Sequence, residues 1–308
     1  MGFDSHLAIA GLIVGFVVGL TGMGGGALMT PILVLLFNVQ PLAAVSSDLV
    51  ASFVMKPIGG AVHLRRGTVH RGLVLWLMAG SVPAAFAGVV ILRLLGNGQR
   101  VQNIVQFALG GALLLAAGII VINVFILLRS ELRGGRVPVP NLGDVPVRPL
   151  PTLAVGILGG LIVGMTSVGS GSLIIVCLLF LYPRLHASQL VGTDLIQAIP
   201  LVGAAALGHV LFGDFHLTLT ASLLVGAIPG VLAGARLSAY APNRPIRWAL
   251  AFVLIASGLK LVNVGTVQLA IVMAVIAVVA PAAWWAARHV TTLRLGGIPG
   301  PAARSADA

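Results

Sequence analysis

Charged side chains are scarce in this sequence. Asp, Glu, Lys and Arg together make up 8% of its 308 residues, whereas a soluble domain carries about 25%. So few charges cannot cover a surface that faces water, and 58% of the residues are hydrophobic, so the chain needs lipid as its solvent. The mean hydropathy of +1.10 agrees with this interpretation. We therefore predict an all-α integral membrane protein that crosses the bilayer several times.

Cysteine is almost absent as well. The single residue, Cys177, cannot form a disulfide within the chain or a thiolate metal site. The 7 histidines are dispersed, and neither an HExxH pair nor a GxSxG nucleophile motif occurs. The acids form no cluster that could hold a metal. We therefore expect no metal, no cofactor and no enzymatic activity.

Acidic residues are fewer than basic ones, 7 against 18, and the net charge is +11. The basic residues are scattered in short loops, without the aromatic interleaving or the basic face that binds nucleic acid. Such an excess is typical of the cytoplasmic loops of membrane proteins. The expected partner is the lipid bilayer, not a nucleic acid.

Long apolar segments occupy most of the chain, and most have the roughly 20 residues that a spanning helix needs. Residues 129–151 differ, because they combine charged residues with several prolines and are expected to form a linker. The apolar segments lie at 7–38, 42–64, 72–92, 101–128, 152–182, 187–212, 217–239, 245–263 and 267–288. The expected division is a first transmembrane repeat over 1–128, a polar Pro- and Arg-rich linker over 129–151, a second transmembrane repeat over 152–263, an extra C-terminal helix over 264–293 and a disordered tail over 294–308.

The two halves of the chain repeat each other. Displacing the first half by 146 positions places Asp48 on Asp194 and Pro83 on Pro229, and several Gly and His positions also coincide. So many matches indicate an internal duplication. Duplication is the signature of secondary transporter folds, in which the substrate binds where the repeats meet. A duplicated scaffold without a transport path is the alternative.

The first segment of each half is too long for one spanning helix. Residues 7–38 would measure about 46 Å at 1.5 Å per residue, against about 30 Å for the hydrocarbon core. Both long segments contain a run rich in small residues, at 21–26 and at 166–172. Each Gly costs about 1 kcal/mol relative to Ala in a helix, so we expect both helices to break there.

Two geometries are open to a broken segment: it crosses the membrane once, or it returns as a re-entrant hairpin of two half-helices. Single crossing would divide the basic residues almost equally between the two faces. Re-entrance leaves Arg93, Arg100 and Lys260 alone on one face, with every other basic residue except Lys56 opposite. The positive-inside rule favours re-entrance. The prediction is two inverted repeats, with about seven spanning helices plus two Gly-broken re-entrant helical hairpins, the N-terminus outside and the C-terminus inside.

Opposed half-helices would bring two helix N-termini, near Gly25 and Ser170, toward the middle of the membrane. Backbone N–H groups and the positive end of the helix dipole favour an anion there. The structural alternative is that the glycines only allow close helix packing. Because two matched clusters occur, we favour the anion site. The substrate-binding candidates are Thr21, Gly22, Gly24, Gly25, Gly26, Ser46, Ser47, Lys56, Thr166, Ser167, Gly169, Ser170, Gly171 and Thr193.

Three ionisable residues lie within apolar segments. Lys56 is a functional candidate, because an intramembrane lysine is costly. It serves either as a counter-charge for an anion or as a structural partner of an acid or a carbonyl, and its counterpart in the second half is Val202. Asp48 and Asp194 lie near the starts of corresponding helices. Helix capping is one interpretation of these two acids, and coupling to a proton or a cation is the other.

The combination of Gly-rich and Gly-x-x-Pro patterns resembles the TauE/SafE sulfite exporter family of membrane anion permeases. Its residues are Gly19–Pro31, Ser46–Asp48 and Gly80–Gly88, and the resemblance covers residues 7–263. It implies secondary transport of small anions, mainly sulfite and organosulfonates such as sulfoacetate, across a bacterial-type inner membrane.

The second copy departs from the family pattern. Ser167 and Ser170 stand where the first copy has Gly22 and Gly25. Their hydroxyls could donate to an oxyanion, or they could mark a different substrate.

The leading hypothesis is a secondary transporter, an exporter or permease, for a small anion such as sulfite or an organosulfonate. Rocking of the two repeats would expose the site alternately to the two sides. Proton coupling is a hypothesis that rests on Asp48 and Asp194. The alternative is a passive anion channel, in which the same breaks form a selectivity filter. The oligomeric state is open, and a homodimer is one of the alternatives.

Overall fold

The computed structural model describes residues 4–21, 25–96, 98–132, 145–185, 187–212, 215–237 and 243–278. Within these ranges every regular element is an α-helix, and no strand occurs. Six of the described helices are long and apolar enough to cross a membrane. The all-α prediction is therefore confirmed. Gly22, Gly24 and the expected tail over 294–308 lie outside the described residues.

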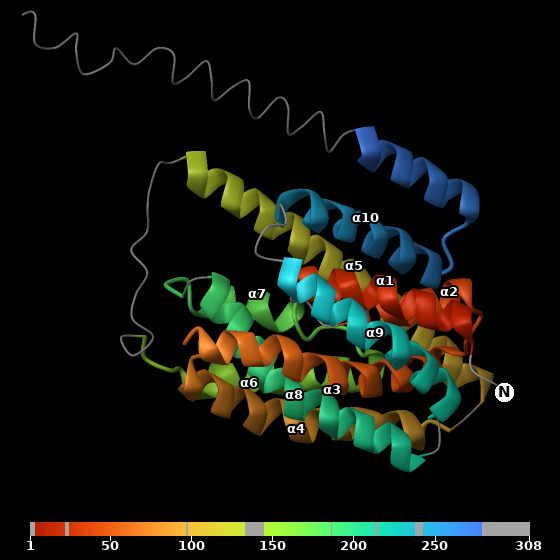
Figure 1. Ribbon diagram of the computed structural model, residues 1–308, viewed down its shortest axis with the longest axis horizontal. Helices are drawn as coiled ribbons and strands as arrows, with labels where there is room; N and C mark the ends of the chain where they lie inside the picture. Colours follow the sequence, from red (N-terminus) through yellow and green to blue (C-terminus); the bar gives the residue numbers. More distant parts are fainter. Residues whose placement is uncertain are drawn as a thin grey trace, which may run out of the picture.

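The helices follow each other as two similar series (Figure 1). The first series is α1 (Ser5–Thr21), α2 (Gly26–Leu36), α3 (Pro41–Arg65), α4 (Arg71–Leu94) and α5 (Gln99–Leu132). The second is α6 (Pro149–Thr166), α7 (Leu173–Leu181), α8 (Ala187–Phe212), α9 (Leu217–Leu237) and α10 (Asn243–Leu261). A further helix covers Thr266–Val278. α5 continues past the expected start of the linker, and α6 begins before its expected end.

The long first segment of each half is broken at the predicted position, between α1 and α2 and between α6 and α7. After α6 the chain reverses through Ser167, Gly169 and Gly171, whose φ angles are 59°, 127° and 100°. Glycine adopts such angles without a steric penalty, whereas other residues rarely do. The glycines of the second run are therefore needed for the reversal itself.

The two arms of each broken helix return to the same end of the bundle. The hydroxyl of Tyr182, after α7, accepts a hydrogen bond of 2.7 Å from the backbone N–H of Arg148, just before α6. It also lies 2.6 Å from the hydroxyl of Thr152. In the first half, Asp4 and Phe37, at the outer ends of α1 and α2, line the same cavity. α1–α2 and α6–α7 are therefore helical hairpins whose tips lie inside the bundle.

Glycines bring the long arm of each hairpin against the fourth helix of the other half. Gly15 of α1 touches the backbone of Ala227 in α9, and Gly160 of α6 touches that of Ser81 in α4. A Cβ at either glycine would collide with the neighbouring backbone. Small residues allow helix backbones to approach this closely in membrane proteins. The long arm of each hairpin thus packs against the other half, whereas the short arms α2 and α7 lie against α3 and α8 of their own halves.

α3 and α8 lie side by side at the centre of the bundle and run in opposite directions, because Gly59 faces Leu195 whereas Gly203 faces Phe53. α5 and α10 are antiparallel in the same way. In both pairs, therefore, a helix of the first series packs against the corresponding helix of the second series in the opposite direction.

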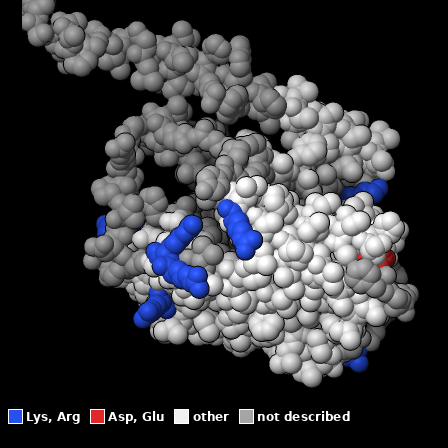
Figure 2. All heavy atoms as spheres, viewed as in Figure 1, with Lys and Arg blue, Asp and Glu red and all other residues white. Residues whose placement is uncertain are grey.

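Charged side chains are few on the face seen in Figure 2, and most of its described surface is free of them. Large apolar side chains such as Phe180 and Leu158 are exposed on the flank, as they are where a protein faces lipid. One end carries Arg93, Arg100 and Lys260 together with Asp4. The opposite end carries Arg65, Arg66, Arg71, Arg148, Arg184 and Arg236.

The close contact of α9 with α1 can be tested by a substitution at Gly226 of α9. A Cβ at this position would collide with the backbone of Ala8. We therefore expect Gly226→Ala to destabilise the protein by about 1–3 kcal/mol and to lower its melting temperature in detergent. Gly118→Ala is the matched control, because Gly118 is an exposed residue of α5 whose Cβ would meet nothing within 4 Å. Equal melting temperatures of the two variants would contradict the contact.

Candidate functional site

The tips of the two hairpins meet at the centre of the bundle. Gly26, the first residue of α2, lies against the backbone and hydroxyl of Ser167, and a Cβ on Gly26 would collide with that backbone. Beside this contact is a cavity of about 20 Å³, lined by Thr21, Ala27 and Ser170 among others. A cavity of this size holds about one water molecule. The tips are therefore closed against each other.

Asp48 of α3 joins the two tips. Its side chain is fully buried, and its Oδ2 accepts hydrogen bonds from Ser167 Oγ at 2.6 Å and from Thr30 Oγ1 at 2.9 Å. Ser52 Oγ lies 3.5 Å from Oδ1. Thr30 belongs to α2 and Ser167 to the α6–α7 connection, so one carboxylate holds hydroxyl groups from both hairpins.

Asp194 of α8 is the matched carboxylate, but its partners are different. Its Oδ1 accepts a hydrogen bond of 2.9 Å from the amide of Gln197, whose Oε1 in turn accepts one of 3.1 Å from Ser81 of α4. The backbone N–H of Gly171, at the second tip, also faces this carboxylate. Oδ2 of Asp194 is buried and has no hydrogen-bond partner among the described residues. This carboxylate therefore retains an unused acceptor.

Lys56 lies between the two carboxylates along α3 and α8. Its side chain is only 4% exposed, and its Nζ has no hydrogen-bond partner in the described part of the chain. Its charge acts on both Asp194 and Asp48. An ammonium group in the bilayer core is costly unless it is compensated, and two carboxylates at longer range compensate this one. The lysine thus retains donors for another anion.

The helix bounds decide between two interpretations of the aspartates. α3 begins at Pro41 and α8 at Ala187, so Asp48 and Asp194 both lie about two turns inside their helices. Neither side chain can reach the N–H groups of the first turn. The capping interpretation of these acids is therefore wrong.

Other predicted binding residues line the tips without offering free hydroxyls. The hydroxyls of Thr21 and Thr166 donate to the carbonyls one turn earlier in their own helices, at 2.8 Å and 2.6 Å. A Cβ on Gly25 would lie 3.4 Å from Asp48 Oδ1, so this glycine leaves room for the carboxylate. Gly169 and Gly171 shape the reversal at the second tip.

Three further candidates lie on α3 and α8. Thr193 is buried, but its hydroxyl accepts a hydrogen bond of 3.0 Å from the backbone N–H of His70 in the α3–α4 connection, so it lies away from the tips. Ser46 donates to the carbonyl of Ala43 at 3.2 Å. Ser47 is fully buried, and its hydroxyl has no hydrogen-bond partner among the described residues.

The sequence reasoning missed the side chains that bind the two aspartates. Ser52 lies one turn after Asp48, and Gln197 lies one turn after Asp194, so helical spacing could have indicated both. Thr30 and Ser81 come from other helices, and no local pattern marks them.

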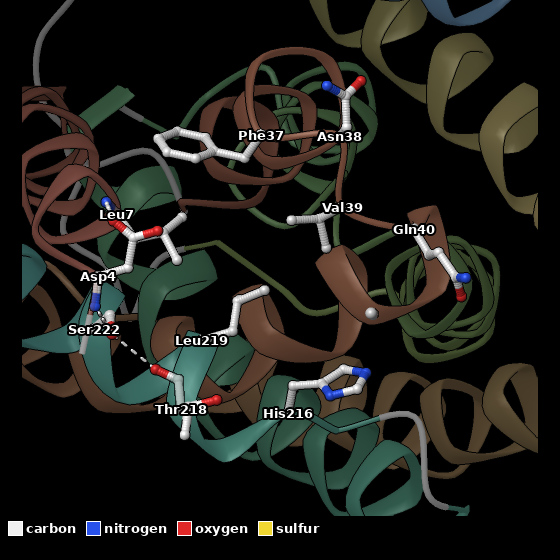
Figure 3. A pocket seen from close by; sticks show the side chains of 11 residues that line it. Asp4, Leu7, Phe37, Asn38, Val39, Gln40, His216, Thr218, Leu219 and Ser222 are labelled. Atoms are coloured by element: carbon white, nitrogen blue, oxygen red, sulfur yellow. Dashed lines mark hydrogen bonds between the residues drawn. The ribbon is translucent and has the colours of Figure 1, made fainter. Parts of the chain in front are cut away.

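A larger cavity opens at the outer ends of the first hairpin, as Figure 3 shows. Its volume is about 580 Å³. Asp4 of the chain before α1, the connection from Phe37 to Gln40, and the start of α9 at His216 and Thr218 surround it. None of its described lining residues is a Lys or an Arg.

Comparison with known protein families gives a match over most of the chain. The family described as "Sulfite exporter TauE/SafE" matches residues 7–261, a span that begins within α1 and ends with α10. No solved structure matches the chain.

Three relatives carry similar printed names. The chain is 40% identical over 260 residues to "Probable membrane transporter protein YjnA" of Bacillus subtilis (strain 168), covering 83% of this chain and 98% of the relative. It is 23% identical over 253 residues to "Probable membrane transporter protein YdhB" of the same organism, covering 81% and 96%. A "Probable membrane transporter protein" of Xylella fastidiosa is 29% identical over 239 residues, covering 75% and 84%. The chain is therefore a multi-pass integral membrane protein, and it belongs to the TauE/SafE sulfite exporter family, a family of transporters and not of enzymes.

Proposed function

We propose that this protein is a secondary transporter that exports a small sulfur oxyanion or organosulfonate, with sulfite as the first candidate. The observation that carries the proposal is the meeting of two broken-helix tips, one from each half, inside the bundle. Irregular backbone at membrane depth is tolerated only where protein encloses it or where it lines a cavity. The N-termini of half-helices favour anions. The sulfur anion comes from the description of the family.

The proposed membrane topology has seven crossings, by α3, α4, α5, α8, α9, α10 and the helix that begins at Thr266. α1–α2 and α6–α7 are then re-entrant hairpins. α6 alone is long enough to cross, but the contact of Tyr182 with Arg148 returns α7 to the end where α6 began. The antiparallel pairs α3–α8 and α5–α10 support inverted repeats. The end with more arginines is cytoplasmic by the positive-inside rule.

Single cysteines test this topology in a Cys177→Ser background. We expect His6→Cys and Gln40→Cys to react with a membrane-impermeant thiol reagent from the outside, since both residues are exposed at the outer end of the first hairpin. Arg66→Cys, exposed at the other end of α3, should react only after the membrane is opened. If His6 and Gln40 label from opposite faces, the first broken segment crosses the membrane once and the re-entrant topology is wrong.

The closed tips favour a carrier over a channel. The cavity beside them has a volume of about 20 Å³, which is room for about one water molecule. A bound oxyanion therefore requires the hairpins to move apart. In a carrier such movement opens the site to one side at a time, whereas a passive channel needs a continuous path. Lys56, a buried lysine whose ammonium group has no hydrogen-bond partner among the described residues and acts on both aspartates, supplies the counter-charge.

Flux measurements test the transport function and the role of Lys56. We expect reconstituted liposomes to show saturable uptake of labelled sulfite that responds to a pH gradient and is accelerated by unlabelled sulfite on the opposite side. Sulfate and a small sulfonate are the comparators. Lys56→Met should lower the flux about tenfold or more, because a hydrogen bond to a charged group contributes about 1.5–3 kcal/mol.

Lys260→Met is the matched control for this flux measurement. Lys260 is an exposed lysine at the end of α10, and its Nζ donates to Thr266 at 3.2 Å, far from the tips. We expect this variant to keep the wild-type flux. Equal flux in both lysine variants would show that Lys56 does not bind the transported anion. The absence of any sulfur-anion flux in the wild-type protein would overturn the proposed substrate class.

A further inference from the structure

The carboxylate of Asp48 already occupies the position that a substrate oxyanion needs. Its oxygen lies at the contact of the two tips, and it accepts hydrogen bonds from Ser167 at 2.6 Å and Thr30 at 2.9 Å. These donors come from the second and the first hairpin, respectively. A sulfite or sulfonate group held between the hairpins would require the same kind of donors. Asp48 and the substrate therefore compete for them.

We propose that Asp48 is a tethered substitute for the substrate, which holds the two tips closed when the transporter is empty and takes up one proton when an anion replaces it. This inference rests on the proposed function, because it assumes that an oxyanion binds at the tips. The proton binds to the carboxylate of Asp48. The hydroxyls of Ser167 and Thr30 then donate their hydrogen bonds to the anion.

Charge balance requires the proton. With all three buried groups ionised, Asp48, Asp194 and Lys56 carry one net negative charge in the core. Binding of a further anion would add a second, and uncompensated buried charge is costly. A proton on Asp48 keeps the charge of the core unchanged when one monovalent anion binds. Anion binding and proton uptake are then linked one to one.

The geometry selects Asp48 over Asp194. The partners of Asp194 include the amide of Gln197, and no hydroxyl donor from a hairpin binds either of its oxygens in the described part of the chain. Its displacement would free an amide of its own helix and the backbone N–H of Gly171 at the second tip, but no group of the first hairpin. Asp48, in contrast, holds one hydroxyl from each hairpin.

The charged surroundings of Asp48 are simple. Lys56, on the same helix, is the charged residue that acts on it, and Asp194 of α8 acts in turn on Lys56. The α2 side and the α6–α7 connection contribute only the hydroxyls of Thr30 and Ser167 and the close glycines. We therefore assign a pH dependence of anion binding to Asp48. Variants of Asp48 can be compared with variants of Lys56 and Asp194 to test this assignment.

The experiment is calorimetric binding of methanesulfonate to the purified full-length protein. Methanesulfonate is the probe because its own charge does not change near neutral pH, and sulfite is the second probe. Titrations in buffers of different ionisation enthalpy give the number of protons taken up. For the wild type we expect about one proton per bound anion, with affinity that falls up to about tenfold per pH unit as the pH rises above the range in which Asp48 is protonated.

The variants separate the two carboxylates. Asp48→Asn should bind methanesulfonate without proton uptake and without pH dependence, and more tightly than the wild type at alkaline pH, because the competing charge is gone. Asp194→Asn should retain the proton uptake and the pH slope. If Asp48→Asn keeps the wild-type slope, or if only Asp194→Asn loses it, the inference is overturned while the transport function stands. If neither probe binds the wild type or Asp48→Asn, both the inference and the proposed substrate class fail.

Ser167→Ala decides the matter if Asp48→Asn does not purify as a folded protein. This variant removes the shared donor at 2.6 Å and leaves the charge of the core intact. Because this hydroxyl binds Asp48 in the empty protein and the anion in the complex, its loss weakens both states, and we expect the affinity at low pH to change little. The ionised form of Asp48 loses a hydrogen bond, so we expect the pH range over which the affinity falls to move to higher pH than in the wild type. An unchanged pH range would mean that Asp48 is not the group that takes up the proton, which overturns the inference.

Discussion

A helix that breaks inside a bilayer leaves backbone N–H and C=O groups without helical partners, and lipid offers them none. Both breaks of this protein are therefore enclosed by protein, with Gly26 of one tip against Ser167 of the other. The long arm of the first hairpin lies against α9 and that of the second against α4, held by glycine contacts between backbones. Because one tip lies on the other and each long arm packs against the opposite half, neither half shields its own break alone.

The duplicated scaffold carries a site that is not duplicated. Asp48 and Asp194 occupy corresponding positions of α3 and α8, yet hydroxyls bind the first and an amide binds the second. Lys56 has Val202 as its counterpart, so a single ammonium group serves both halves. On the proposed mechanism the symmetric scaffold allows the two halves to exchange conformations, whereas the asymmetric side chains give the protein one anion site.

The sequence predicted the features that rest on local signals. Two runs of small residues indicated the helix breaks, and Arg93, Arg100 and Lys260 were expected to share one face, as they share one end of the bundle. The partners of the side chains could not be predicted in the same way. A membrane helix is apolar on every side, so its hydrophobic pattern does not tell which face meets which neighbour. For this reason the bond of Thr30 to Asp48 and that of Thr193 to the backbone of His70 were not foreseen.

In the proposed topology, the two ends of the path for the anion differ in charge. The cytoplasmic end of the proposed topology carries arginines that attract anions, whereas the described lining of the outer cavity contains Asp4 and neither Lys nor Arg. Between these ends Lys56 is a deeply buried positive charge. An anion bound to Lys56 must dissociate from it in order to leave. Asp48 and Asp194 are the charged groups that can then compensate the lysine in place of the anion. On the proposed mechanism, release therefore depends on Asp48, the carboxylate that closes the empty site.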